Sequence, residues 1–320
     1  MENLNSPKTS SSSSGLFDEL PKERCWGGRE FYNWEGFWYR SDFLSAAIST
    51  RSYFKARDDD VILASSVKTG TTWLKALIPS IMHRKQDHNN DDNDSDPLIK
   101  NHPNSLVPSF ELQIFRENPK ADLSGMPSPR LFRTHMPYMM LPDSVKESGC
   151  RIVYITREPK DVFVSLWHFI TANTRPEQGL CTLDEAFENY CEGIHGFGPF
   201  HDHVLSYWKE SLKRPEKILF LKYEELKRDP KCQVQKLASF LGRPFVDEEE
   251  IDKIIWRCSF ERLKNLEVNR NGTDPNAGFS YKSYFRKGSV GDWKNFLSEE
   301  MKERLDNITQ MKLEGSGLNL

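Results

Sequence analysis

The chain has 320 residues, of which 37% are hydrophobic and 12% aromatic, and it can therefore bury a large core, which excludes a disordered or collagen-like protein. The 44 Lys and Arg residues against 47 Asp and Glu residues leave a net charge of −3. This balance argues against a general nucleic-acid-binding protein, which would carry a basic excess, but it permits a local anion site built from a few cations.

The N-terminal residues are polar and rich in serine. They predict a disordered tail over residues 1–15, followed by one domain over residues 16–320. No run reaches the roughly 18 to 20 apolar residues that a membrane span needs, and the first residues lack the apolar core of a secretory signal. The six cysteines form no C-x-x-C pair, as is typical of reduced thiols. We expect a cytoplasmic protein that neither enters a membrane nor binds nucleic acid.

Apolar runs that alternate with helical patterns predict the fold class. Continuous apolar runs, typical of central strands in a parallel sheet, lie at residues 61–64, 152–155 and 218–221. Each run leads into a helical pattern, at residues 71–82, 159–170 and 224–241. Further helical patterns cover residues 183–191, 203–212, 248–257 and 299–311, and a polar stretch at 87–96 predicts a solvated loop. The alternation predicts a single α/β domain with a central parallel sheet flanked by helices.

The turn after the first apolar run has the composition of a phosphate cradle. It reads Lys68-Thr69-Gly70-Thr71-Thr72-Trp73. A glycine before a helix lets the backbone approach an anion, the free N–H groups of the helix start attract it, and Lys68 and the threonine hydroxyls add charge and hydrogen bonds. The segment is not a Walker A loop, because the lysine precedes the only glycine. From the residues alone, an ordinary glycine turn fits equally well.

Three other places in the sequence could contribute to the same anion site. Arg157 ends the second apolar run just before a helix, and Ser165 on that helix could reach the same group. Tyr223 ends the third run, and Arg286-Lys287-Gly288 lies in a glycine-punctuated loop near the C-terminus. Each place also fits a role without a ligand: Arg157 as a surface arginine paired with an acid, Tyr223 as the end of a strand, and residues 286–288 as a basic turn.

His135 is the candidate general base. It follows a short apolar segment at residues 131–134 that predicts another strand, and an imidazole at a strand end beside an anion site suits proton transfer. A structural histidine fits the same position. His201 and His203 are two residues apart on a predicted helix and point in different directions, so we expect no metal site there.

Taken together, these segments resemble the cytosolic sulfotransferase family, and within it the soluble plant enzymes. The likeness runs from about residue 20 to residue 318. Residues 68–75 are similar to the family's 5′-phosphosulfate loop, and residues 154–157, 159–161 and 164–165 are similar to its 3′-phosphate motif. Thr134-His135 with Pro137 lies at the place of the family's catalytic histidine, and residues 286–288 with 291–294 are similar to its C-terminal lid.

The resemblance implies 3′-phosphoadenosine 5′-phosphosulfate (PAPS) as co-substrate, bound by a P-loop-like phosphosulfate-binding turn. It implies that Trp73 and Phe260 stack on the two faces of adenine, and that Arg157, Ser165 and residues 286–288 hold the 3′-phosphate. The implied donor-binding residues are Lys68, Thr69, Gly70, Thr71, Thr72, Trp73, Arg157, Ser165, Tyr223, Phe260, Arg286, Lys287 and Gly288.

The implied reaction moves a sulfuryl group to the hydroxyl of a small acceptor. His135 would take the hydroxyl proton and Lys68 would stabilise charge on the leaving phosphate, with no metal. Among plant members the acceptors are flavonoids, steroids including brassinosteroids, hydroxyjasmonates and desulfoglucosinolates. Phe110, Phe115, Phe169 and Tyr281 fit apolar walls of an acceptor pocket and fit core positions equally.

Three departures from the family pattern leave alternatives open. Val67 replaces the usual proline before the lysine, and Glu158 stands where asparagine is frequent. The mammalian dimerisation stretch is disrupted between Lys294 and Glu303, so we expect a monomer or a weak homodimer. A non-catalytic nucleotide- or small-molecule-binding protein of the same fold is the alternative function. A nucleotide kinase would need a Walker A turn and a magnesium-binding acid, and we find neither.

Overall fold

The computed structural model describes residues 17–84, 96–174, 179 and 181–320. A central sheet has four parallel strands in the order β5-β4-β6-β7. These strands are β4 (Val61–Ser65), β5 (Leu131–Thr134), β6 (Arg151–Thr156) and β7 (Ile218–Lys222). The predicted parallel sheet is confirmed, including the strand expected before His135. The predicted tail over residues 1–15 and nearly all of the predicted loop at 87–96 lie outside the described residues.

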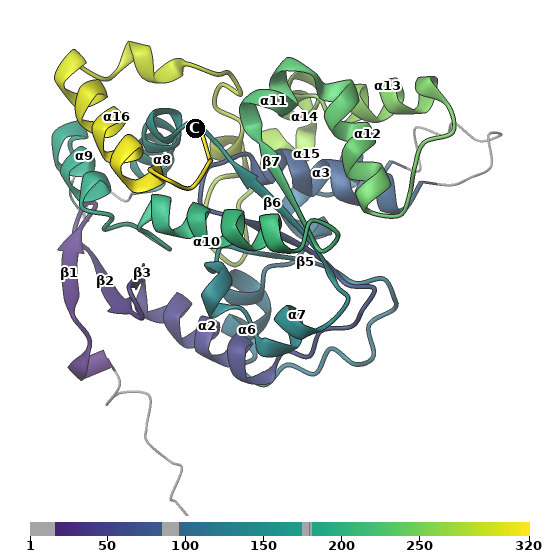
Figure 1. The fold of residues 1–320 in the computed structure, drawn as a ribbon, viewed down its shortest axis with the longest axis horizontal. Coiled ribbons are helices and arrows are strands. Elements are labelled where there is room, and N and C mark those ends of the chain that lie inside the picture. Colours follow the sequence, from purple (N-terminus) through teal and green to yellow (C-terminus); the bar gives the residue numbers. More distant parts are fainter. Residues whose placement is uncertain (1–16, 85–95, 175–178, 180) are drawn as a thin grey trace, which may run out of the picture.

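Helices form most of the remaining described structure (Figure 1). The α-helices are α2 (Ser41–Tyr53), α3 (Thr71–Met82), α4 (Pro97–Lys100), α5 (Pro103–Leu106), α6 (Phe115–Glu117), α7 (Asp143–Glu147), α8 (Pro159–Ala172), α9 (Leu183–Cys191), α10 (Phe200–Lys213), α11 (Tyr223–Arg228), α12 (Pro230–Phe240), α13 (Glu248–Arg257), α14 (Phe260–Asn265), α15 (Glu267–Arg270) and α16 (Glu299–Leu313). Shorter turns are η2 (Phe110–Ile114), η3 (Tyr138–Met140), η5 (Tyr281–Tyr284) and η6 (Asp292–Asn295).

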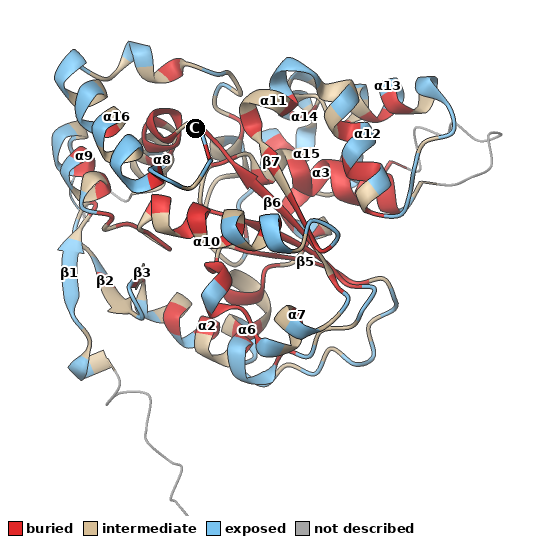
Figure 2. Ribbon diagram, viewed as in Figure 1, coloured by how far each residue is buried: buried red, intermediate tan, exposed pale blue. Residues whose placement is uncertain are grey.

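The two faces of the central sheet are both buried, which is why its strands are continuous apolar runs (Figure 2). Val61 and Leu63 of β4 belong to one core with α3, α12 and α13. The intervening Ile62 and Ala64 belong to a second core with α2 and η2. Since side chains alternate along a strand, this division places a layer of helices on each face.

The helical pattern at 224–241 is two helices instead of the single helix expected. α11 ends at Arg228 and α12 starts at Pro230. Proline has no N–H to continue the first helix, but it is well suited to the first position of a new one. The Asp229 side chain accepts a hydrogen bond from the Cys232 N–H at 3.0 Å and caps α12.

An N-terminal antiparallel sheet was not predicted. It consists of β1 (Lys22–Cys25), β2 (Arg29–Trp34) and β3 (Phe37–Tyr39), and it leads directly into α2. Its Trp38 N–H donates to the Gly198 carbonyl at 2.8 Å, which fixes the sheet against the segment before α10. None of the described helices has the length and apolarity to cross a membrane.

Candidate active site

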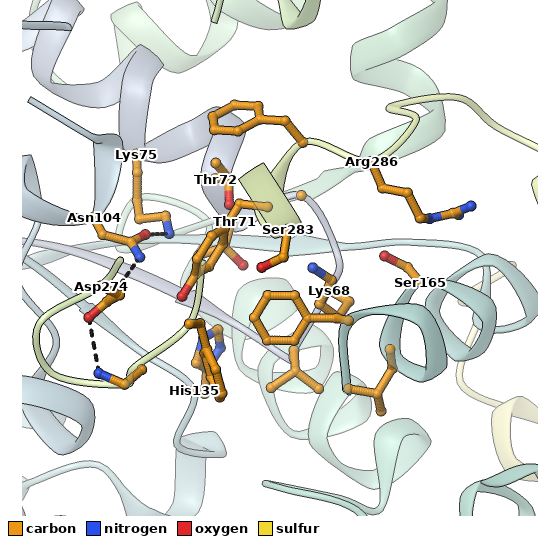
Figure 3. Close-up of a pocket in the computed structure, with 18 of the residues that line it drawn as sticks. Lys68, Thr71, Thr72, Lys75, Asn104, His135, Ser165, Asp274, Ser283 and Arg286 are labelled. Carbon is orange, nitrogen blue, oxygen red and sulfur yellow. Dashed lines mark hydrogen bonds between the residues drawn. The ribbon is translucent and has the colours of Figure 1, made fainter. Parts of the chain in front are cut away.

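A cavity of 490 Å³ lies at the carboxyl edge of the central sheet (Figure 3). Each of the four parallel strands ends beside it. Lys68 follows β4, His135 follows β5, Arg157 follows β6, and Tyr223 follows β7, and all four line the cavity. Parallel strands bring residues that are far apart in sequence to a common edge, where open α/β sheets bind ligands.

The turn before α3 has the backbone shape of an anion cradle. Lys68 and Gly70 both have positive φ angles, of 65° and 115°, and Gly70 is the N-cap of α3. A Cβ atom on Gly70 would lie 2.8 Å from the Tyr223 ring, so only glycine fits there. The Thr69 hydroxyl donates to the Ser66 carbonyl at 2.9 Å, and the Thr71 and Ser65 hydroxyls are 2.7 Å apart. These bonds hold the turn open toward the cavity.

The charge of the cavity fits a polyanionic ligand. Ten Lys and Arg side chains line it among the described residues, against a single carboxylate, that of Asp274. Lys68 is half-buried and lines the cavity. Burial, followed by repulsion from Arg157 and Arg286, lowers its pKa to about 7. An anion bound beside Lys68 would offset this repulsion and raise the pKa of the lysine again.

Three of the aromatic residues that line the cavity, Trp73, Tyr223 and Phe260, lie near the donor turn or the C-terminal loop. Trp73 lies edge-on to Tyr223, with ring centroids 5.9 Å apart, and its buried indole Nε1 has no hydrogen-bond partner among the described residues. Gly288 has a φ of +64°, and a Cβ atom there would lie 2.5 Å from the Phe260 ring. Gly288 therefore packs directly against Phe260, one of the two predicted adenine-binding aromatics.

The cations predicted at the 3′-phosphate are brought together, but they already have partners. Arg157 donates to the Ser289 carbonyl at 2.8 Å and pairs with Asp161 at 3.1 Å, while its Nε atom is buried without a partner in the described structure. Arg286 and Lys287 both pair with the Asp292 carboxylate. Ser165, from α8, lines the same cavity.

Asp161 joins the C-terminal loop to α8. Its buried carboxylate accepts hydrogen bonds from the Gly291 N–H at 2.8 Å and from the Trp293 N–H at 3.1 Å, in addition to its pair with Arg157. The segment that carries Arg286 and Lys287 is thus held against the helix that starts after β6.

His135 is held by its backbone and by its ring. Its Nδ1 lies 2.9 Å from the Ser65 carbonyl, which can only accept, so Nδ1 carries the proton and Nε2 carries the lone pair. Its N–H donates to the buried Glu111 carboxylate at 2.7 Å, and its carbonyl lies 2.9 Å from the Nε2 of His203. The Tyr154 hydroxyl lies 2.9 Å from the other nitrogen of His203 and completes the chain.

The pKa of His135 is lowered to about 3, first by burial and then by the nearby Arg133. The imidazole is therefore neutral at physiological pH and can accept a proton. Glu111 also accepts from the Thr134 hydroxyl at 2.9 Å, and burial raises the pKa of its carboxyl group. We did not predict Glu111, because a single acid within the apolar stretch of η2 gives no local signal.

A second polar group near the turn was also not predicted. Lys75 contacts the Asn104 side-chain oxygen, and the Asn104 amide donates to Asp274 at 2.7 Å (Figure 3). Lys75 is buried, and burial lowers its pKa well below the ordinary value. These residues come from α3, α5 and the segment before η5, which are brought together only by folding.

The apolar residues considered as acceptor walls divide into two groups. Phe169 lines the cavity, and the Lys68 ammonium lies 3.9 Å from its ring centroid. Phe110 and Phe115 are fully buried core residues. Tyr281 stacks on His102 at 4.0 Å and is not one of the lining residues. The remaining apolar walls include Phe31, Phe43, Leu112 and Phe197.

No group of three or more His, Cys, Asp or Glu side chains among the described residues is arranged to hold a metal ion.

Comparisons with known proteins agree on one family. The family model described as "Sulfotransferase domain" matches residues 58–317. Cytosolic sulfotransferase 5 of Arabidopsis thaliana is 44% identical over 308 residues, which cover 95% of this chain and 94% of that protein. The crystal structure of a proposed steroid sulphotransferase of Arabidopsis thaliana is 37% identical, with a TM-score of 0.76 over 96% of this chain and 94% of that one. A mouse sulfotransferase crystallised with the nucleotide PAP is 30% identical, with a TM-score of 0.67 over 89% and 95% of the two chains.

Proposed function

The chain belongs to the sulfotransferase family and is a sulfotransferase enzyme, and from this we propose that it transfers the sulfuryl group of PAPS to a small hydroxylated acceptor with His135 as the general base. One observation carries the proposal. The free Nε2 lone pair of a neutral His135 lies in the same cavity as the cradle formed by Lys68 and the start of α3.

The residues of the cradle fit a phosphosulfate. Gly70 permits the left-handed backbone of the turn and its close packing on Tyr223. The first turn of α3 presents its N–H groups and positive dipole end, and Lys68 supplies a cation. Trp73 and Phe260 would bind the adenine, and Tyr223 would line the site. When bound, PAPS supplies the sulfuryl group and leaves as 3′-phosphoadenosine 5′-phosphate (PAP).

The 3′-phosphate would bind Arg157, Ser165 and the loop of residues 286–288. The unpaired Nε of Arg157 supports this placement, because a buried donor without a partner is costly and an anion would satisfy it. Asp292 would have to share Arg286 and Lys287 with the phosphate.

His135 would accept the acceptor's hydroxyl proton at Nε2. The hydrogen bond from Nδ1 to the Ser65 carbonyl fixes the tautomer and the ring orientation that this role needs. Lys68 and the N–H groups of the turn would stabilise the negative charge that gathers on the leaving phosphate oxygen. A cation and oriented backbone donors suffice for this task, so the proposal includes no metal.

The acceptor would be a flavonoid, steroid, hydroxyjasmonate or desulfoglucosinolate type of molecule, bound by the apolar walls near His135. We further propose that the protein is cytoplasmic, since its Arabidopsis relatives are named as cytosolic enzymes. We also propose a monomer or weak homodimer, because the stretch between Lys294 and Glu303 departs from the dimerisation pattern.

The test is turnover with PAPS in a His135→Gln variant. We expect kcat to fall by roughly 10² to 10⁴, the usual contribution of a positioned base, while calorimetric binding of PAP changes little. The loss should be larger for an aliphatic alcohol than for a phenol at high pH, since a phenol with a pKa near 10 partly ionises without help. His83→Gln, at an exposed position, is the matched control.

A His135→Gln variant within threefold of the parent on both acceptors would refute the role of the base. Binding of PAP without turnover of any acceptor class by the parent would instead favour a non-catalytic binding protein.

A further inference from the structure

The cavity contains a second group of cations, separate from those around Lys68. Arg29, at the start of β2, and Arg40, just before α2, both line it. Arg157 follows β6 and Arg286 lies in the loop before η6, whereas Arg29 and Arg40 belong to the N-terminal segment that precedes the central sheet. The two groups thus come from different parts of the fold, and the donor cradle does not account for the second.

A line of aromatic rings connects His135 to this second group. The His135 ring lies 5.6 Å from the Phe197 ring, and Phe197 stacks on Phe43 at 5.9 Å with an interplanar angle of 15°. The Arg40 guanidinium lies 4.8 Å from the centroid of Phe43. An acceptor with its hydroxyl at His135 would therefore run along two aromatic rings and end at a guanidinium.

The positive charge at this end is only partly neutralised. Arg40 and Arg116 share one carboxylate, that of Asp42, at 3.2 Å and 2.9 Å. Arg29 has no carboxylate within 4 Å among the described residues, and its hydrogen bonds go to the neutral Trp26 carbonyl and Thr174 hydroxyl. Arg40 thus shares its one acid with Arg116, and Arg29 has none in the described structure.

Arg29 is half-buried, and its environment disfavours its charge. Burial, and then the nearby Arg40, lower its pKa from the ordinary value. A half-buried cation without an anionic partner costs free energy that a bound anion would recover. Guanidinium groups bind carboxylates through paired hydrogen bonds, and a carboxylate here would also separate two like charges.

We propose that the acceptor is an amphipathic hydroxy acid, with its hydroxyl at His135, its apolar middle along Phe197 and Phe43, and its carboxylate between Arg29 and Arg40. This inference rests on the proposed sulfotransfer reaction and narrows its acceptor class. Neutral hydroxylated molecules would fill the aromatic part of the cavity but leave Arg29 without an anionic partner and Arg40 with only its shared pair to Asp42.

The experiment compares ω-hydroxyalkanoic acids of six to twelve carbons with their methyl esters, using PAPS as donor. Each pair has the same hydroxyl and the same apolar chain, so the ratio of kcat/KM for acid over ester measures the carboxylate alone. We expect the acid to be favoured by roughly tenfold to a hundredfold at the best chain length, the range for a charge-assisted hydrogen bond.

Arg29→Gln and Arg40→Gln should each bring the acid-to-ester ratio toward one. Arg51→Gln is the matched control, since Arg51 is an exposed arginine of α2 that pairs with Glu35 and does not line the cavity. It should retain the parent ratio. The two cavity arginines are changed separately, so if one variant fails to fold, the other still tests whether the carboxylate binds there.

Equal use of acids and esters by the parent, or a ratio that survives both substitutions, would overturn the hydroxy-acid proposal alone. If no hydroxyl compound is sulfated, the proposed function fails. Calorimetric binding of 10-hydroxydecanoate and of its methyl ester to the PAP-bound protein then tests whether Arg29 and Arg40 bind a carboxylate. Tighter binding of the acid that is lost in Arg29→Gln would support it, and equal binding would refute it.

Discussion

The unusual pKa of Lys68 predicts that nucleotide binding takes up a proton. With a pKa of about 7 in the free protein, Lys68 is about half charged at pH 7 and about one-tenth charged at pH 8. A phosphate beside its ammonium would return the pKa toward the ordinary value, so the bound lysine would be fully charged. PAP binding should then take up about 0.9 proton at pH 8 and about 0.5 at pH 7, and Kd should rise about tenfold per pH unit above 7.

The assay is titration calorimetry of PAP at pH 8 in two buffers of different ionisation enthalpy. Phosphate groups, with a second pKa near 6, are already ionised there and contribute little. Lys68→Arg keeps the charge but cannot lose it, so it should bind PAP without proton uptake. Lys213→Arg, at an exposed position of α10, should behave as the parent. A parent that takes up no proton at pH 8, or a Lys68→Arg variant that takes up as many, would refute the reasoning.

Three further predictions follow from the geometry. Gly288→Ala would place its Cβ 2.5 Å from the Phe260 ring, so PAP affinity should fall at least about tenfold by calorimetry, whereas Gly315→Ala, with a φ of +71° and nothing within 4 Å, should bind PAP as the parent does. Glu111→Ala leaves the His135 N–H and the Thr134 hydroxyl without an acceptor, so kcat should fall about tenfold to a hundredfold at unchanged PAP affinity. Glu111→Gln keeps an acceptor oxygen and should recover part of the lost kcat. An unchanged kcat in Glu111→Ala would contradict this role of Glu111. The free energy of unfolding, measured in urea, should drop as the pH falls from 7 to 5. The reason is that four buried histidines have pKa values of only about 2 to 4 in the folded chain. Below pH 6.5 these side chains take up protons in the unfolded chain but not in the folded one, which lowers the free energy of unfolding by about 2 kcal/mol for each histidine at pH 5. An unchanged urea midpoint would contradict it. These histidines are His102, His195, His201 and His203.

The sheet and the donor turn could be predicted because their signals are local. β4 is buried along its whole length, so its apolar run has no polar interruption, and the turn that follows needs glycine within a few residues of a lysine. The split between α11 and α12 carries an equally local signal in Asp229-Pro230, which the longer apolar periodicity concealed. The N-terminal sheet gives no such signal, because β2 has one buried residue among six and lacks a clear alternation.

The acceptor end of the site could not be predicted, because tertiary contacts alone assemble it. Arg40 and Phe197 are more than 150 positions apart, and nothing near either residue in the sequence indicates a ligand. Glu111 acts on His135 across 24 positions through a backbone N–H, a contact that leaves no pattern in the sequence. The same holds for Lys75, whose side chain meets Asn104 of α5 only in the folded chain.

Ser65 contacts both halves of the reaction, since its carbonyl accepts from His135 and its hydroxyl contacts Thr71 of the donor turn. For protein engineering, the donor turn and His135 therefore form a single unit, because a change that moves the turn also moves Ser65 and with it the imidazole. Arg29 lies in β2, Arg40 just before α2 and Phe43 in α2, all outside that unit. Swapping that segment between relatives should therefore exchange acceptor preference while leaving the transfer machinery of the recipient intact.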